Sequence, residues 1–278
     1  MEGVTPHQIL ENPDLIAAGM AGDDVRRRMH GARTTFVRVL EIHVDALPPT
    51  LPLRVSAGEV RLVGHPSSLG AAVAAVRAAA TLAGTIPVTG FSVLDLQGLE
   101  EPLADVCAAL RAAGLIAVTH LQIDAATSPH DATLAVRSAG LLLGTISVQV
   151  IGQDERLAIC ERASELQAML GGFRAFAPLP RTLSVTQPTT GYDDARMIAL
   201  ARVVATNIAS IQVDWQLYGP KMAQVALTVG ADDVDNVSAV DPGVLGTRRS
   251  PLEEIKGNIR AAGLEAVERD GLFTERQV

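Results

Sequence analysis

The sequence is poor in cysteine, aromatic side chains and basic clusters, and each shortage excludes a class of protein. Its 278 residues include only two cysteines, Cys107 and Cys160, too few for a disulfide-stabilised secreted scaffold. Aromatic residues make up 3% of the chain, which disfavours a β-sandwich with a core of Tyr and Trp. The formal net charge is −8, and helical spacing would scatter the densest basic cluster, Arg26–Arg28. Nucleic acid is therefore not an expected partner.

Long hydrophobic runs and targeting signals are missing as well. The Ala-rich stretch from Ala71 to Leu82 contains Arg77 and is followed by Gly84, so it is too short and too polar to cross a membrane. The first residues are polar and acidic, unlike a signal peptide. We therefore expect a cytoplasmic protein with no membrane partner, in which both cysteines are buried free thiols.

Aliphatic residues are abundant, and their spacing predicts alternating strands and helices. Hydrophobic residues make up 48% of the chain, a composition that suits parallel strands buried on both faces. The predicted strands are Thr35–Val44, Glu59–Gly64, Ile86–Val93, Ile116–Leu121, Thr145–Ile151, Phe173–Ala177, Ser210–Val213 and Asp232–Val234. The predicted helices are Ser68–Ala83, Pro102–Ala113, Pro129–Ser138, Asp154–Leu170, Gly191–Ala205, Pro220–Val229 and Pro251–Ala262.

This alternation predicts an α/β fold, a (βα)8-type (TIM-like) parallel barrel that is complete or slightly incomplete. The alternative is an open doubly wound sheet, but no Gly-rich dinucleotide-binding fingerprint follows the first strand. Residues 1–33 are expected to form helices that cap the bottom of the barrel, and residues 34–278 the barrel itself. No linker or repeat indicates a second domain, so residues 1–278 are predicted to form a single one.

Polar residues at the carboxyl ends of the predicted strands are the candidates for a site, because barrel proteins bind their ligands there. The ligand-binding candidates are His43, His65, Asp95, His120, Gln149, Asp214, Trp215, Asp232 and Asp233. Competing interpretations make Trp215 a core residue and the aspartates caps of strands and helices. For Glu268, Arg269 and Asp270 a surface ion pair is the favoured interpretation.

Three stretches of the sequence together resemble a known family. They are Asp23–Gly31 followed by Thr35–Val37, the segment Gly171–Pro180, and the region from Ala201 to Asp233 with Asp214-Trp215 and Gly219-Pro220-Lys221. They resemble the radical S-adenosylmethionine enzymes of the futalosine route to menaquinone, aminodeoxyfutalosine synthase and dehypoxanthine futalosine cyclase. More distantly, they are similar to the enzymes that build the deazaflavin of coenzyme F420. The resemblance implies a radical-SAM-like barrel and a place in menaquinone biosynthesis.

The sequence departs from this family where its chemistry is carried out. In the family, a Cys-x3-Cys-x2-Cys motif after the first strand holds a [4Fe–4S] cluster. Here the corresponding segment, Val44–Pro52, contains no cysteine, and Pro48 stands roughly where the first would fall. Thiolate ligation of such a cluster needs at least three cysteines at one place. We therefore expect no [4Fe–4S] cluster, no other cofactor and no radical chemistry, and whether the protein is an enzyme at all stays open.

Two functions are compatible with these observations. In the first, a cluster-lacking homologue binds a nucleoside- or chorismate-derived small molecule, or supports an active radical S-adenosylmethionine relative, or pairs with itself as a homodimer. In the second, a metal-dependent hydrolase or lyase holds Zn or Fe with His43, His65, His120 and Asp95, although no close His-x-His spacing supports it. The Pro48–Pro52 loop is expected to be either a plug across the barrel mouth or a surface loop. Ser67 or Ser68 is expected to cap the following helix.

Overall fold

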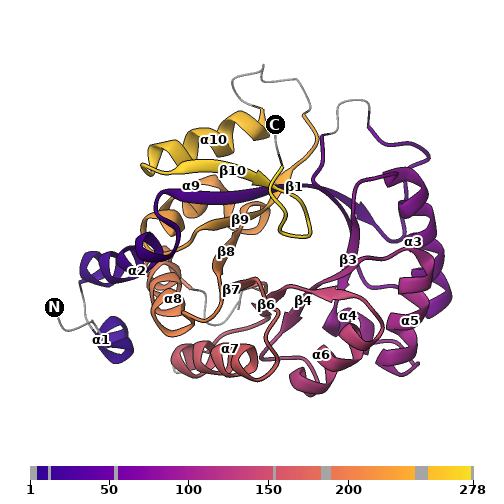
Figure 1. Ribbon diagram of the computed structural model, residues 1–278, viewed down its shortest axis with the longest axis horizontal. Helices are drawn as coiled ribbons and strands as arrows, with labels where there is room; N and C mark the ends of the chain where they lie inside the picture. Colours follow the sequence, from indigo (N-terminus) through magenta and orange to yellow (C-terminus); the bar gives the residue numbers. More distant parts are fainter. Residues whose placement is uncertain are drawn as a thin grey trace.

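The structure, a computed structural model, describes residues 5–11, 14–52, 56–152, 155–182, 189–241 and 250–276. Eight parallel strands form a closed barrel with helices around it (Figure 1). Around the barrel these strands are β1 (Arg33–His43), β2 (Glu59–Val63), β3 (Val88–Ser92), β4 (Ala117–Gln122), β6 (Thr145–Val148), β7 (Ala175–Pro180), β8 (Ser210–Asp214) and β9 (Asp233–Ser238). Pairing of β9 with β1 closes the ring. The predicted (βα)8-type barrel is confirmed.

Helices precede β1 and connect most of the strands. They are α1 (Pro6–Glu11), α2 (Leu15–His30), α3 (Leu69–Ala83), α4 (Val93–Gln97), α5 (Leu103–Ala113), α6 (Pro129–Ser138), α7 (Arg156–Leu170), α8 (Gly191–Val204), α9 (Trp215–Thr228) and α10 (Pro251–Ala261). The predicted cap of α3 is Ser68, whose hydroxyl accepts a hydrogen bond from the Ala71 amide at 3.2 Å. None of the described helices combines the length and the apolar character that a bilayer crossing requires.

The N-terminal helix α2 lies along α8 at the flank of the barrel (Figure 1). Asp14 caps it by accepting hydrogen bonds from the Ile16 and Ala17 amides at 2.9 and 3.2 Å. A Cβ atom at Gly22 would lie 2.2 Å from the Val229 carbonyl oxygen. Only glycine therefore allows α2 to approach the barrel this closely.

Two short elements and one further strand were not predicted. The single-turn helix α4 begins directly after β3, and β5 (Leu142–Leu143) precedes β6. Strand β10 (Glu265–Arg269) pairs in parallel with the first half of β1. The prediction of a surface ion pair at Glu268 and Arg269 was wrong: these residues are 4% and 3% exposed. They lie on an added strand that packs against β1 and α10, where Glu268 pairs with Arg38 and Arg269 with Asp233.

The segment between β1 and β2 contains no helix among its described residues 44–52 and 56–58. Leu47 and Leu51 pack against the hydrophobic core, whereas Pro49 and Thr50 are exposed. No residue of the Pro48–Pro52 loop lines either of the two barrel cavities described below. The described part of the loop lies on the surface and outside these two cavities.

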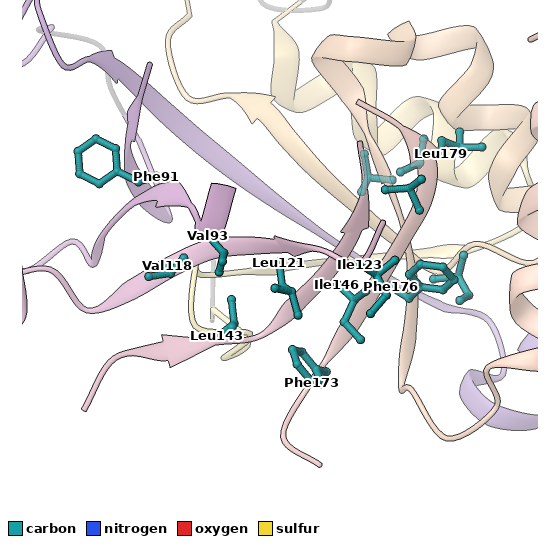
Figure 2. Packing of buried hydrophobic residues seen from close by; sticks show 14 of the residues in the cluster. Phe91, Val93, Val118, Leu121, Ile123, Leu143, Ile146, Phe173, Phe176 and Leu179 are labelled. Atoms are coloured by element: carbon teal, nitrogen blue, oxygen red, sulfur yellow. The ribbon is translucent and has the colours of Figure 1, made fainter. Parts of the chain in front are cut away.

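The main core lies between the strands and the surrounding helices. Alternate strand residues such as Leu62, Ile146 and Phe176 belong to one cluster with the helical Ala, Val and Leu side chains. Figure 2 shows part of this core, where β4, β6 and β7 contribute Leu121, Ile146 and Phe176. Because a strand exposes successive side chains to opposite faces, the residues between these positions point into the barrel.

Candidate functional site

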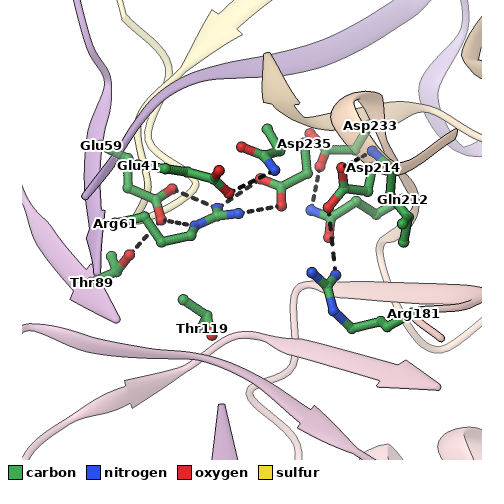
Figure 3. A network of polar contacts seen from close by, with 12 residues as sticks. Glu41, Glu59, Arg61, Thr89, Thr119, Arg181, Gln212, Asp214, Asp233 and Asp235 are labelled. Atoms are coloured by element: carbon green, nitrogen blue, oxygen red, sulfur yellow. Dashed lines mark hydrogen bonds and ion pairs between the residues drawn. The ribbon is translucent and has the colours of Figure 1, made fainter. Parts of the chain in front are cut away.

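The interior of the barrel is polar. Glu59 and Arg61 alternate with core residues along β2, Gln212 and Asp214 do so along β8, and Asp233 and Asp235 along β9. Most (βα)8 barrels fill this space with layers of branched aliphatic side chains. Here the same positions carry charges and amides, which converge on one network (Figure 3).

Arg61 is the centre of this network. Its guanidinium contacts both oxygens of Asp235 at 2.8 and 2.9 Å and both oxygens of Glu59 at 2.7 and 3.0 Å. Burial alone would raise the pKa of Asp235, but its ion pair and hydrogen bonds with Arg61 outweigh burial and hold that pKa below its usual value. Asp235 is therefore ionised at neutral pH, and Arg61 joins it to Glu59 through charge-assisted hydrogen bonds.

A second buried cluster surrounds Asp233. Arg269 donates two hydrogen bonds to its carboxylate at 2.7 and 2.6 Å, and Gln212 donates a third at 2.7 Å. The Thr35 hydroxyl donates a fourth. All four contacts tie β1, β8, β9 and β10 together, so Asp233 joins the strands and has no capacity left for a ligand.

Three polar groups at the carboxyl end of the barrel keep capacity for a ligand. One oxygen of Asp214 caps α9 by accepting from the Leu217 amide at 2.9 Å, while the buried Oδ2 has no hydrogen-bond partner among the described residues. Arg181 lies 3.5 Å from that oxygen. Burial, together with nearby Asp235, raises the pKa of Asp214. Burial, Arg181 and Arg61 lower the pKa of His120 well below its usual value, so its imidazole is neutral at physiological pH.

Two cavities occupy the barrel. The carboxyl-end cavity, of about 230 Å³, lies among the ends of β1, β2, β3 and β4, and Glu41, Asp95 and Gln149 are among its lining residues. The amino-end cavity, of about 680 Å³, extends from the interior to the opposite end of the barrel. Arg61, Thr119, His120 and Arg181 line both. These four side chains therefore separate the two spaces.

Several of the predicted ligand-binding residues lie at the carboxyl-end cavity. Asp95, His120 and Gln149 line it. His65 lies beside it, with its Nδ1 atom 2.5 Å from Asp95 Oδ1 and its side chain 85% exposed. His43 packs over Gly64, where a Cβ atom would lie 2.7 Å from the His43 Nε2 atom.

Trp215 and Asp232 lie elsewhere. Trp215 is 8% exposed and belongs to the hydrophobic core. Asp232 forms a buried ion pair with Arg202 and accepts a hydrogen bond from the Ile211 amide at 2.9 Å. Neither residue lines a barrel cavity. The competing interpretations therefore apply here: Trp215 is a core residue, and Asp232 caps the start of a strand.

The described residues do not support the metal-dependent alternative. They include no group of three or more His, Cys, Asp or Glu side chains arranged to hold a metal ion. His65 is paired with Asp95, and His120 lies near two arginines that would repel a cation.

The residues present also do not fit a thiolate-bound [4Fe–4S] cluster. The segment after β1 contains no cysteine. Cys107 and Cys160 lie in α5 and α7, both fully buried in the core. Burial raises the pKa of both thiols, that of Cys107 to about 11, which disfavours the thiolate that a metal requires.

Five charged residues inside the barrel or at its carboxyl-end cavity were not among the predicted site residues, because only positions just past the strand ends were considered. They are Glu41, Glu59, Arg61, Arg181 and Asp235. A signal was available in two of the strands, where Glu59-x-Arg61 and Asp233-x-Asp235 place charges on one face of a buried strand. Charges at that spacing in such a strand must find partners inside the barrel.

Comparison with known proteins supports the resemblance. Residues 174–278 match the family described as the CofH/MqnC C-terminal region. Aminodeoxyfutalosine synthase of Thermus thermophilus is 34% identical over 140 residues, covering 45% of this chain and 37% of that protein. The 5-amino-6-(D-ribitylamino)uracil–L-tyrosine 4-hydroxyphenyl transferase 2 of Methanosarcina barkeri is 31% identical over 173 residues, 56% of this chain and 44% of that protein. Cyclic dehypoxanthine futalosine synthase of Streptomyces coelicolor is 32% identical over 142 residues, 47% of this chain and 36% of that protein.

Solved structures agree on the fold. Methylornithine synthase superposes with a TM-score of 0.63 at 11% identity, covering 95% of this chain and 94% of that one. HydG, a maturase of the [FeFe]-hydrogenase, superposes with a TM-score of 0.63 at 13% identity, covering 96% of this chain and 72% of that one. The chain is thus a parallel (βα)8 barrel that is similar, over about half of its length, to aminodeoxyfutalosine synthase and cyclic dehypoxanthine futalosine synthase. It spans less than half the length of the curated relatives it matches.

Proposed function

We propose that this protein binds a small polar molecule inside its barrel, as a homologue of the futalosine-pathway radical enzymes that works without an iron–sulfur cluster. One observation carries the proposal: polar groups with unused hydrogen-bonding capacity lie where the two cavities meet. The neutral imidazole of His120 and the guanidinium of Arg181 line both cavities, and Arg181 lies 3.5 Å from the buried Oδ2 of Asp214, which has no hydrogen-bond partner among the described residues. A buried polar atom without a partner is costly, and a ligand that supplies one removes that cost.

The absence of a cluster rests on the sequence of the segment after β1 and on the two remaining thiols. A cluster site without cysteines would need another ligand set, and the described residues offer none. Radical cleavage of S-adenosylmethionine needs an electron from such a cluster. The inherited barrel therefore serves binding or non-radical chemistry.

The relatives indicate which ligands to try first. Their names specify aminodeoxyfutalosine, dehypoxanthine futalosine and 5-amino-6-(D-ribitylamino)uracil. All three compounds carry several hydroxyl groups, and such groups match a hydrogen-bonding interior better than an apolar one. A nucleoside- or chorismate-derived compound of this kind is the proposed ligand class.

Isothermal titration calorimetry with these three compounds tests the proposal. We expect at least one of them to bind to the wild type. Asp214→Asn should weaken that binding about tenfold, because it removes the charge that holds Arg181 at the two cavities. The matched control is Asp45→Asn, whose side chain is 68% exposed and which should bind like the wild type. Absence of binding by all three, or equal binding by the Asp214 variant, would contradict the proposal.

A further inference from the structure

The amino-end cavity opens at the end of the barrel opposite to the one that usually holds the site. Its mouth is bounded by Leu142–Gly144 before β6, by Gly172 and Arg174 before β7, and by the turn Gly271–Thr274 after β10. In Figure 1 this yellow turn projects from β10 into the ring of strands. Phe273 packs against Gly144, where a Cβ atom would lie 2.9 Å from the ring. The mouth therefore has apolar walls.

Arg137 of α6 brings a fixed positive charge to this mouth. Its guanidinium stacks 4.7 Å from the centroid of the Phe173 ring and donates to the Leu170 carbonyl at 3.2 Å. Its Nη2 atom is buried and has no hydrogen-bond partner within the described part of the chain. Gly172, with a φ of +75°, faces it: a Cβ atom there would lie 3.0 Å from Nη2. Burial lowers the pKa of Arg137, as expected for a cation that lacks an anion.

Two further groups complete the arrangement. Arg174 also lines the cavity, and like Arg137 it forms no ion pair with any described acidic side chain. Deeper inside, Ser147 is fully buried, lines the cavity, and its hydroxyl has no hydrogen-bond partner in the described ranges. Two unpaired arginines at one mouth are unexpected in a chain of net charge −8 unless an anion from outside meets them.

We infer that the amino-end cavity binds a small carboxylic acid with a ring-shaped apolar body. The carboxylate would lie between Arg137 and Arg174, because the planar guanidinium fork matches carboxylate geometry. The ring would pack against Leu142, Leu272 and Phe273, and a polar substituent would reach Ser147. A volume of about 680 Å³ is in the range of small-molecule pockets. This inference rests on the proposed function. It adds that the ligand carries a carboxylate and that the ligand binds at the amino end of the barrel.

The probe pair 4-fluorobenzoate and 4-fluorobenzamide isolates the carboxylate, since the two differ little in shape but only one is charged. Fluorine NMR titration of the wild type should show the benzoate binding about tenfold more tightly than the benzamide. In Arg137→Gln/Arg174→Gln this preference should disappear. Arg77→Gln, an exposed arginine in the middle of α3, is the matched control and should keep it.

The single variant Arg174→Gln changes only an exposed side chain, so it can be tested even if the double variant does not fold. We expect it to reduce the preference for the benzoate over the benzamide at least threefold. Equal affinity of the wild type for the two probes, or a preference unchanged in both variants, would overturn the inference. Binding of a futalosine-type compound that depends on Asp214, combined with no preference for benzoate, would overturn the inference and leave the proposed function standing. A benzoate preference that depends on the arginines supports the inference even if those compounds do not bind.

Discussion

Replacing Arg61 with glutamine should destabilise the protein strongly, because it leaves two buried carboxylates without their counter-charge. Glu59 and Asp235 are 2% and 8% exposed, and Arg61 contacts all four of their oxygens within 3.0 Å. Removing one partner of a buried ion pair costs about 3–5 kcal/mol. Since two carboxylates lose their partner here, we expect a loss in the upper part of that range at neutral pH.

Urea unfolding at pH 7 measures this loss as a change in the free energy of unfolding. Arg33→Gln is the matched control: it removes an ion pair with Glu275 whose side chains are 50% and 59% exposed, and it should change little. The low pKa of Asp235 in the folded protein adds a pH signature. Its ionised form stabilises the fold above the unfolded-state pKa, and this contribution is lost as the pH falls through the folded pKa. The wild type and the Arg61 variant should therefore converge in acid. A loss below about 1 kcal/mol at pH 7, equal to that of the control, would refute the reasoning.

Three further results are expected. Asp214→Asn should raise the melting temperature at pH 7, because the raised pKa of Asp214 means that its ionised form costs stability, and the asparagine oxygen can still accept a hydrogen bond from the Leu217 amide. This gain in melting temperature should vanish below the usual pKa of aspartate. An equal effect at both pH values would contradict the prediction. Gly22→Ala should lower the free energy of unfolding, measured with urea, by about 1–3 kcal/mol, because the added Cβ atom clashes with the Val229 carbonyl oxygen. Gly257→Ala is the control: a Cβ atom at this position in α10 meets no neighbour, so the change should be neutral or stabilising. Cys107 and Cys160 should react with a thiol reagent at pH 8 only after unfolding, because burial raises the pKa of both; rapid labelling of the native protein would count against their burial.

Much of the fold could be predicted from short-range patterns. The predicted strands Glu59–Gly64 and Ser210–Val213 coincide with β2 and β8, because apolar residues recur at every second position where one face of a strand meets the core. The helix α4 was missed even though Ser92 and Asp95 form a capping box, since five residues are too few for periodicity. Strand β10 was missed because its pairing with β1 joins residues more than two hundred positions apart.

The candidate site could be predicted only in part. The rule that barrel sites lie at strand ends led to Asp95, His120 and Gln149, which line the carboxyl-end cavity. The same rule could not identify Arg61 or Asp235, because their roles depend on closure of the barrel, which places β2 and β9 on either side of β1. Nor could it show that Asp233 is fully occupied while its neighbour Asp214 is not.

Anaerobic reconstitution with iron and sulfide tests directly whether the barrel works without an iron–sulfur cluster, as proposed. The protein would be incubated with ferrous iron, sulfide and reductant, desalted, and analysed for iron, acid-labile sulfide and visible absorption, with S-adenosylmethionine cleavage as a second readout. Since Cys107 and Cys160 are both buried in separate helices, we predict substoichiometric iron, no charge-transfer absorption and no 5′-deoxyadenosine. Four iron and four sulfide ions per chain, with reductive cleavage of S-adenosylmethionine, would contradict the account.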